Sequence, residues 1–461
     1  MAVNSPIDGK DFATITAGTA DDVDHAVAAA RAAFEDRRWA GMAPAARGAV
    51  LTRLADLITA EALSLAVLGV RDNGTEISMA LRAEPGSAAA TFRWYGGAID
   101  KIYGEIAPTA GSHLGLIHRE PVGVIGAIVP WNFPLMIGAW KLAPALAAGN
   151  SVVLKPAETA SLSLLRLAEL ASEAGLPDGV LNVVTGTGAE VGQALALHHD
   201  VGVLTFTGSG ATGRKLLRYA ADSNLKRTYL ELGGKSANVV FADAPDLAQA
   251  AQVAAGAIFR NAGQVCVAGS RLLVEASIAD AFSAQVTEAA EALKVGDPLD
   301  PATEIGAVHS EAQLAQNLVH VRAAQDEGAR CLLGGARIRE DTGGSFMQPT
   351  IFTDVAAHHR LFREEVFGPV LSITPFETEA EAIHLANATD YGLAGGVWTA
   401  DLGRAHRMIR AIRTGVVHVN CYGGPDVTVP MAGTGQSGNG ADKSLHALDK
   451  YTDLKTAWIA L

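Results

Sequence analysis

The stretch that decides the fold class is Val203-Leu204-Thr205-Phe206-Thr207-Gly208-Ser209-Gly210-Ala211-Thr212-Gly213. Residues 203–206 form a short apolar run typical of a buried strand, and the residues after the stretch have a helical pattern. Gly208, Gly210 and Gly213 fit the spacing G-x-G-x-x-G between the two. Such glycines let the backbone approach a pyrophosphate, which the N–H groups of a helix N-terminus can bind. A plain tight turn between a strand and a helix can have the same glycine spacing, so the motif by itself leaves both interpretations open.

Apolar runs alternate with helical patterns on both sides of this stretch. We expect strands over 122–129, 151–154, 180–184, 203–206 and 236–241, and helices over 162–174, 214–221 and 247–260. A second series after residue 270 predicts strands over 271–274, 370–375 and 415–420. Strands that alternate with helices indicate parallel sheets covered by helices. We therefore expect two α/β lobes with a small-molecule site in the crevice between them.

Charge and hydropathy exclude two classes of partner. The 461 residues include 36 Lys and Arg against 49 Asp and Glu, and this net charge of -13 disfavours binding to nucleic acid. Residues 121–140 carry no charge and have the length of a membrane-spanning helix. Pro121, Pro130 and Pro134 would break such a helix, so we expect a buried strand and a loop there, and no membrane partner.

Three cysteines, Cys266, Cys331 and Cys421, are too few for a disulfide framework and lack the spacing of metal ligands. We therefore expect no metal site and a reducing, cytoplasmic location, in a chain that opens without a targeting signal. Cys331 and Cys421 lie beside apolar or strand residues and are predicted to be buried and inert. Cys266 follows a predicted helix in a loop with glycine, where a thiol can face a cleft, although burial is the commoner fate of a cysteine.

Five motifs resemble signatures of the NAD(P)-dependent aldehyde dehydrogenase superfamily, in the order of that family and over most of the chain. They are Pro130-Trp131-Asn132-Phe133-Pro134, Lys155-Pro156-Ala157-Glu158, Glu231-Leu232-Gly233-Gly234-Lys235, Gly263-Gln264-Val265-Cys266 and Glu364-Glu365-Val366-Phe367-Gly368-Pro369. The resemblance implies that the Cys266 thiolate attacks an aldehyde. It also implies that the Asn132 side chain and the Cys266 backbone N–H stabilise the resulting oxyanion.

Two further catalytic roles follow from the same resemblance. Glu231 would be the general base that activates water for release of the acid, and Lys141 would take part in proton relay. Without the family, the residues have ordinary interpretations: Asn132 as a turn residue, Glu231 as a surface carboxylate and Lys141 as a lysine that extends to solvent.

The cofactor implied is a nicotinamide dinucleotide. Glu158, with Lys155 beside it, would bind the adenosine ribose, Gly208 and Ser209 the pyrophosphate, and Glu365 and Phe367 the nicotinamide riboside. Ile128, Trp131 and Leu232 would line the same groove. A carboxylate at Glu158 accepts hydrogen bonds from ribose hydroxyls and repels a 2′-phosphate, so we expect NAD rather than NADP.

The C-terminal segment narrows the aldehyde. Residues 435–448, together with Asp426-Val427-Thr428-Val429-Pro430, are similar to bacterial gamma-glutamyl-gamma-aminobutyraldehyde dehydrogenases. Phe133, Met136 and Trp140 would line the aldehyde channel, and Asp426 would attract an ammonium group near its mouth or be an ordinary loop aspartate. Met431-Ala432-Gly433-Thr434-Gly435 replaces an aromatic turn of the family, which would widen or soften the channel.

The family implies a Rossmann-like NAD-binding domain (1–102 and 122–233), a second α/β catalytic domain (234–436) and a small antiparallel oligomerisation arm (103–121 and 437–461). An exposed sheet edge in the arm would pair with another chain, so we expect a homodimer or homotetramer. Two alternatives stay open. The first is a CoA-acylating aldehyde dehydrogenase, a class that generally lacks the glutamate found here at Glu231. The second is a non-catalytic NAD-binding paralogue, which would bind the cofactor without turnover.

Overall fold

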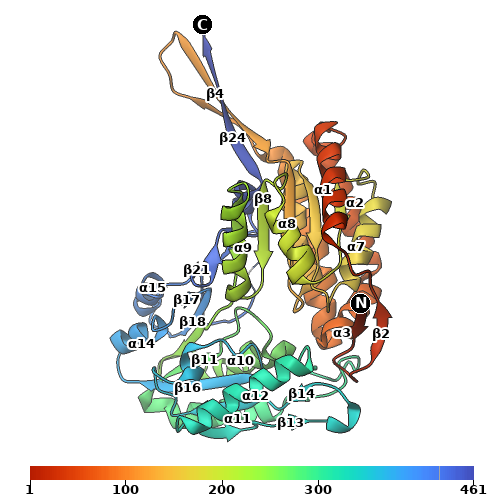
Figure 1. The fold of residues 1–461 in the computed structure, drawn as a ribbon. Helices are drawn as coiled ribbons and strands as arrows, with labels where there is room; N and C mark the ends of the chain where they lie inside the picture. Colours follow the sequence, from red (N-terminus) through yellow and green to blue (C-terminus); the bar gives the residue numbers. More distant parts are fainter. Residues whose placement is uncertain (425) are drawn as a thin grey trace.

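The computed structural model describes residues 1–424 and 426–461. Two helix-covered sheets form two lobes, and a narrow antiparallel sheet projects from the first lobe (Figure 1). The two α/β lobes and the antiparallel arm confirm the fold class predicted from the sequence. Among the described residues, no helix combines the length and the apolarity needed to cross a bilayer.

The sheet of the first lobe has the strand order β22-β9-β8-β5-β6-β7, in which β22 alone is antiparallel to its neighbour. Its strands are β5 (Val124–Ile128), β6 (Ser151–Lys155), β7 (Leu181–Val183), β8 (Val203–Thr207), β9 (Arg227–Glu231) and β22 (Gly438–Asn439). Every residue of β5, β6 and β8 is buried, as expected for parallel strands covered on both faces.

Helices cover both faces of this sheet. One face carries α1 (Ala20–Glu35), α8 (Gln193–Leu197) and α9 (Gly210–Asp222), and the other carries α2 (Pro44–Ala60), α5 (Ser87–Ala98), α6 (Pro134–Ala148) and α7 (Leu162–Glu173). Successive β5 side chains alternate between the faces: Val124 and Ile128 pack with the first set, Ile125 and Ala127 with the second. Helices α3 (Ala62–Asn73) and α4 (Ile77–Leu81) pack together beside them.

The second lobe contains a sheet of order β12-β15-β16-β11-β10-β18-β19, parallel except for β12. Its strands are β10 (Ala237–Val240), β11 (Arg271–Glu275), β12 (Arg330–Leu333), β15 (Thr350–Thr353), β16 (Val370–Phe376), β18 (Ala394–Trp398) and β19 (Val416–Val419). Its helices are α10 (Leu247–Phe259), α11 (Ala279–Glu291), α12 (Glu311–Asp326), α13 (Arg360–Arg363), α14 (Glu379–Ala386) and α15 (Leu402–Ala411). The strands and helices predicted from apolar periodicity all occur, with boundaries shifted by a few residues.

Short ribbons complete the fold. They pair β1 (Ala2–Asn4) with β2 (Asp11–Thr14), β13 (Arg337–Ile338) with β14 (Phe346–Met347), β17 (Tyr391–Gly392) with β21 (Thr434–Gly435), and β20 (Met431–Ala432) with β23 (Ala441–Asp442). The projecting sheet has the order β24-β4-β3, from β3 (Glu105–Ala107), β4 (His113–Pro121) and β24 (Thr452–Ala460). Sheet pairing thus divides the segment 437–461: β24 joins the arm, whereas β22 completes the first-lobe sheet beside Glu231.

A buried asparagine joins the base of the arm to the first lobe. The Asn150 Nδ2 group donates hydrogen bonds to Ala145 O (3.0 Å) and Tyr451 O (2.9 Å), and its Oδ1 accepts the Gly123 N–H (2.9 Å). Asn150 has no exposed surface, so its side chain binds these three backbone groups out of contact with water. The end of α6, the start of β5 and the start of β24 therefore share one polar anchor.

We predict that Asn150→Ala lowers the free energy of unfolding by at least about 2 kcal/mol, because it leaves the buried Gly123 N–H without an acceptor and removes one hydrogen bond from each of two backbone oxygens. Urea denaturation followed by tryptophan fluorescence measures the loss. Asn4→Ala is the control, since Asn4 also donates to a backbone oxygen, that of Gly9, but is exposed. Equal midpoints for both variants would contradict the anchoring role of Asn150.

Candidate active site

The first cavity lies at the point where the strand order of the first sheet reverses. β6 and β7 extend the sheet from one side of β5, and β8 and β9 extend it from the other. Loops after the carboxyl ends of β5 and β8 separate there, which is where open α/β sheets bind ligands. The cavity measures about 200 Å³ and is lined by Pro130, Trp131, Asn132, Ile137, Thr207, Gly208, Ser209, Leu232, Gly233, Cys266, Gln313, Glu365 and Phe367. Most of the residues predicted to bind the dinucleotide therefore meet in one groove.

The glycine-rich turn after β8 leads directly into helix α9. Gly208 packs against the ring of Phe206, and a Cβ at Gly208 would lie 2.4 Å from that ring. Ser209 is the N-cap, and its Oγ accepts the Thr212 N–H (3.3 Å). The N–H groups that begin a helix have no intrahelical partner, so they can bind an anion. This geometry favours the phosphate-binding interpretation of the turn over that of a plain connection.

Three predicted residues lie beside the groove, at the carboxyl ends of β5 and β6. Ile128 pairs in register with Lys155. The Lys155 Nζ donates to Glu158 Oε2 at 2.8 Å, and this hydrogen bond and charge outweigh burial and lower the pKa of Glu158. Glu158 therefore carries a negative charge, held by a buried lysine, near the place expected for a ribose.

Aromatic rings form the opposite wall of the groove. The Trp131 ring stacks on His309 with centroids 4.1 Å apart and planes 9° apart, and Phe367 meets Trp131 edge-on at 5.3 Å. Burial lowers the pKa of His309 to about 3, so the imidazole is neutral. Sequence reasoning missed His309, because no motif surrounds it and it reaches Trp131 only through the packing of the two lobes.

Glu365 lies against the two glycines that follow Leu232. Its Oε1 accepts the Gly234 N–H at 2.8 Å, and a Cβ on Gly233 would lie 1.9 Å from its Oε2. Only glycine at 233 therefore leaves room for this carboxylate. Burial raises the pKa of Glu365 to about 7.

An unusual backbone turn presents Cys266. Asn261, Ala262 and Gly263 have φ values of 51°, 48° and 73°, which are left-handed and strained for the first two. Two residues of the first lobe hold Asn261: the Thr75 hydroxyl donates to Asn261 Oδ1 (2.7 Å), and Glu76 Oε1 accepts the Asn261 N–H (3.2 Å). The turn that follows α10 is therefore built by contacts between the lobes.

Gln264, the residue after Gly263, makes further hydrogen bonds that hold the turn between the lobes. Its Oε1 accepts the His309 N–H (2.7 Å), its Nε2 donates to Asn261 O (3.1 Å), and its backbone oxygen accepts from Asn132 Nδ2 (2.9 Å). The Asn132 amide has a second N–H in addition to the one donated to Gln264. The Asn132 side chain and the Cys266 loop are therefore held together.

Helix α6 carries one wall of a second cavity. The helix begins at Pro134 without a side-chain cap from Phe133. Instead the buried Glu84 accepts the Met136 N–H at 2.7 Å, and burial raises the pKa of Glu84 to about 8. Glu84 therefore satisfies a helix end that the local sequence leaves open.

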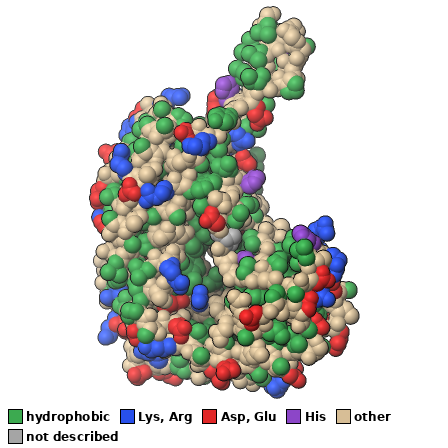
Figure 2. Space-filling model, turned by 180° about the vertical axis from the view of Figure 1, so that it is seen from behind, with side chains coloured by type: hydrophobic (Ala, Val, Ile, Leu, Met, Phe, Trp, Pro, Cys, Tyr) green, Lys and Arg blue, Asp and Glu red, His purple; other side chains and the backbone are tan. Residues whose placement is uncertain are grey.

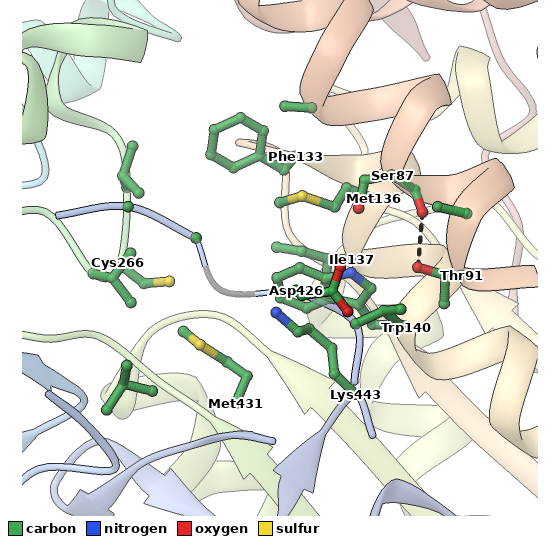
Figure 3. Close-up of a pocket in the computed structure, with 18 of the residues that line it drawn as sticks. Ser87, Thr91, Phe133, Met136, Ile137, Trp140, Cys266, Asp426, Met431 and Lys443 are labelled. Atoms are coloured by element: carbon green, nitrogen blue, oxygen red, sulfur yellow. Dashed lines mark hydrogen bonds between the residues drawn. The ribbon is translucent and has the colours of Figure 1, made fainter. Parts of the chain in front are cut away.

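This second cavity measures about 400 Å³ and also reaches Cys266. All four residues predicted to contact substrate, Phe133, Met136, Trp140 and Asp426, line it together with Met431 and Lys443 (Figure 3). Cys266 and Ile137 border both cavities. Figure 2 shows the surface hollowed between the two lobes. The thiol thus lies where the two cavities meet.

Burial, reinforced by Glu365 and Glu231, raises the pKa of Cys266 to about 12. The group is a thiol in this state and must lose its proton before it can attack. Cys331 is partly buried, and Cys421 is exposed, so the prediction that Cys421 is buried is wrong. The reason is that β19 ends at Val419 and places Cys421 in the following loop.

Glu231 ends β9 beside a buried group of charges. Asp442 accepts from Lys141 Nζ at 3.0 Å and from Lys450 Nζ, and all of these side chains are buried. Among the described residues, no group donates a hydrogen bond to Glu231 Oε1. Burial, with the nearby negative charge of Asp442, raises the pKa of Glu231 well above its usual range. Burial also opposes ionisation of Asp442, but the two ammonium groups outweigh it and lower the pKa of that carboxyl.

Asp442, Lys450, Lys443 and Gln313 are site residues that sequence reasoning did not identify. The tail motif contains two of them but does not indicate which of its polar residues point inward. No group of three or more His, Cys, Asp or Glu side chains in the described part of the chain is arranged to hold a metal ion.

Known proteins resemble this chain in sequence and in fold. Residues 1–457 match the aldehyde dehydrogenase family. The chain is 54% identical over 456 residues to the NADP/NAD-dependent aldehyde dehydrogenase PuuC of Escherichia coli strain K12, which covers 99% of this chain and 91% of that protein.

Two solved structures are nearly superimposable on this one. The gamma-glutamyl-gamma-aminobutyraldehyde dehydrogenase of Burkholderia cenocepacia is 50% identical, with a TM-score of 0.98 over 100% of this chain and 93% of its own. An indole-3-acetaldehyde dehydrogenase in complex with NAD+ is 52% identical, with a TM-score of 0.99 over the same shares. The chain therefore belongs to the aldehyde dehydrogenase family and is an enzyme that oxidises an aldehyde to the carboxylic acid with NAD.

Proposed function

We propose that Cys266 is the nucleophile of this oxidation and that the aldehyde carries an amide- or amine-bearing chain. One observation carries the assignment: of the three cysteines, Cys266 alone borders both the dinucleotide groove and the apolar channel. An aldehyde in the channel and a nicotinamide in the groove would meet at its sulfur. Cys331 and Cys421 border neither cavity.

Attack of the sulfur on the aldehyde carbon forms a tetrahedral adduct with a negatively charged oxygen. The second N–H of Asn132 and the backbone N–H of Cys266 stabilise this oxyanion where its charge develops. The groove fits a dinucleotide, because the start of helix α9 at Ser209 and the rings of Trp131 and Phe367 border it together. When bound, NAD supplies the hydride acceptor. Trp131, Leu232, Glu365 and Phe367 hold the riboside, and Ile128, Lys155 and Glu158 hold the adenosine end, with Gly208 and Ser209 at the pyrophosphate.

Loss of hydride leaves the acyl group on Cys266 as a thioester, which water must hydrolyse. Glu231 takes a proton from that water, and its pKa, raised by burial, makes its carboxylate a stronger base than that of an exposed glutamate. Asp442 and Lys141 form a buried ion pair close enough to Glu231 for their charges to act on its carboxyl. The water oxygen enters the carboxylic acid, and the thiol of Cys266 is restored.

The channel supports a long, partly apolar aldehyde with a polar distal end. Phe133, Met136 and Trp140 line its length, and Met431 occupies the position where the family has an aromatic turn. Asp426 provides a carboxylate at the same cavity. The name of the Burkholderia enzyme indicates that it acts on an aldehyde with a gamma-glutamyl amide. In this chain, the motif that begins at Asp426 and residues 435–448 resemble the corresponding motifs of such enzymes. We propose an aminoaldehyde, or its N-acyl derivative, as the substrate.

The arm supports assembly of two or four copies. Leu454 and Trp458 on β24 are 63% and 62% exposed, and Ile106 on β3 is 72% exposed. β24 and β3 form the two edges of the projecting sheet (Figure 1). Exposed apolar side chains on an open edge favour pairing with an identical arm. In this proposal the NAD-binding part consists of residues 1–102 and 122–233. The catalytic part is 234–436, and the assembly part consists of 103–121 and the C-terminal strand. The free thiols support a cytoplasmic location.

We predict that Cys266→Ala lowers aldehyde-dependent NADH formation by more than about 10⁴-fold, because no other thiol reaches the channel. NADH absorbance measures activity, and calorimetric titration with NAD should give a Kd close to that of the unmodified enzyme. Cys331→Ala is the matched control and should remain active. Retained turnover in the Cys266 variant would refute the assignment.

Glu231→Gln should uncouple the two halves of the reaction. We expect a burst of about one NADH per active site followed by turnover slowed about 10²- to 10⁴-fold, because the thioester forms but water is not activated. Stopped-flow absorbance gives the burst, and intact mass detects the acyl group on the protein. Glu340→Gln, a change at an exposed carboxylate, should show no burst. Slow turnover without an acyl-enzyme would place the role of Glu231 before the thioester.

Leu454→Asp combined with Trp458→Asp should convert the assembly into single chains, because charged side chains on the arm oppose its apolar pairing. Light scattering at micromolar concentration measures the mass. Leu402→Asp, at a leucine on α15 that is 71% exposed, is the control. A single-chain mass for the unmodified protein would remove the proposal of a homodimer or homotetramer.

A further inference from the structure

The substrate channel is mostly apolar, and two charged side chains border it together. Asp426 and Lys443 are the charged residues among the described lining of the cavity of about 400 Å³. Figure 3 shows the Lys443 nitrogen beside Asp426, with the Cys266 sulfur pointing into the same cavity from across the channel. A pair of opposite charges in such a channel recognises more than a single ammonium group.

Lys443 is held in place by its neighbours in the chain. It has φ 64° and follows Asp442, whose carboxylate is fixed between Lys141 and Lys450. The next residue, Ser444, donates its N–H to Val427 O (2.8 Å) and accepts the Tyr95 hydroxyl on its backbone oxygen (2.8 Å). The bond to Val427 ties Lys443 to the loop that carries Asp426. The two chain segments that carry these charges are therefore joined by a backbone hydrogen bond.

The Lys443 side chain lies along the channel wall. Its Nζ is 5.2 Å from the centre of the Trp140 ring, and the whole residue is only 3% exposed. Burial lowers the pKa of Lys443 to about 8, against the opposing effects of Asp426 and Asp442. Hydrogen bonds from Thr428, followed by the charge of Lys443, lower the pKa of Asp426. The channel thus presents a carboxylate and an ammonium group next to each other.

This arrangement changes what Asp426 can select. An aldehyde that ends in an ammonium group alone is attracted by Asp426 and repelled by Lys443, so the two effects offset each other. An aldehyde that ends in a carboxylate alone is attracted by Lys443 and repelled by Asp426, so the two effects offset each other again. A distal group with both charges on one carbon matches both residues at once, and each new pair is a charge-assisted hydrogen bond.

We propose that Lys443 is a specificity-determining residue that binds the carboxylate of an aldehyde ending in an α-amino acid group, while Asp426 binds its ammonium. The inference rests on the proposed function, because it assumes an N-acyl aminoaldehyde in the channel. To the proposed function it adds a specificity-determining residue outside the reacting centre, and it specifies that the distal end of the aldehyde is zwitterionic.

Four aldehydes of matched length test the proposal. All are amides of 4-aminobutanal: the γ-glutamyl amide has both charges, the glutaryl amide only the carboxylate, the 4-aminobutanoyl amide only the ammonium, and the butanoyl amide neither. The ratio of kcat/KM for the γ-glutamyl amide to that for the 4-aminobutanoyl amide isolates the carboxylate. The ratio for the γ-glutamyl amide to the glutaryl amide isolates the ammonium.

Lys443→Met should reduce the carboxylate ratio at least about tenfold, and Lys443→Arg should restore part of it. Asp426→Asn should reduce the ammonium ratio instead. Lys10→Met, at an exposed lysine far from the channel in sequence, should change neither ratio. Thermal unfolding and NAD binding show whether each variant is folded, and each ratio is internal to one variant, so partial loss of active protein does not affect it.

A carboxylate ratio that is the same in Lys443→Met and the unmodified enzyme would overturn the proposal. So would equal kcat/KM of the unmodified enzyme for the γ-glutamyl and butanoyl amides, and in that case oxidation of all four amides would leave the proposed function standing. If the unmodified enzyme oxidises propanal but none of the four amides, the proposed substrate class fails, and this inference fails with it.

Discussion

The hydrogen bonds of Gln264 and Asn261 hold the thiol loop between the two lobes, and the rest of the site depends on them. Asn261 and Ala262 occupy left-handed backbone conformations that cost on the order of 1–3 kcal/mol each, and at Gly263 a Cβ would lie 2.1 Å from Gly368 O. Such a turn persists only where its surroundings favour it strongly. Here the surroundings come from both lobes: Thr75, Glu76 and Asn132 on one side, His309 on the other. The same contacts that join the lobes therefore place Cys266 in the wall shared by groove and channel.

A second constraint is the buried group of charges behind Glu231. Two carboxyl groups and two ammonium groups lie out of contact with water, and removal of one partner from such a group leaves an uncompensated buried charge. Asp442 uses both of its oxygens to accept from lysines and stays ionised. Glu231, whose Oε1 accepts no hydrogen bond from the described residues, favours its protonated form. In the proposed mechanism, this difference separates a fixed charge from a group that exchanges protons. It also limits the negative charge facing the Cys266 sulfur.

Individual residues show how far sequence reasoning reached. The predicted strands and the glycine-rich turn between β8 and α9 occur where the sequence places them, since each is a local pattern of apolar spacing and glycine. Asn132 and Cys266 were expected to act together, and the Asn132 amide does donate to the backbone of the thiol loop. His309, Asp442 and Lys450 were missed because each meets its partner across the fold: His309 on Trp131, and the other two around Lys141. The segment 437–461 was treated as one unit, but its pairing partners lie in different sheets.

The sequence by itself determined the alternation of strands and helices, the residue types in the five motifs and the family. These depend on periodicity and on chemistry that only certain side chains provide. Tertiary structure alone decided that one thiol borders two cavities, that Glu231 is buried without a hydrogen-bond donor among the described residues, and that Lys443 lies beside Asp426. The physical reason is that burial, charge pairing and the shape of a cavity arise from residues that are distant in the chain, and local patterns carry no information about which of them meet.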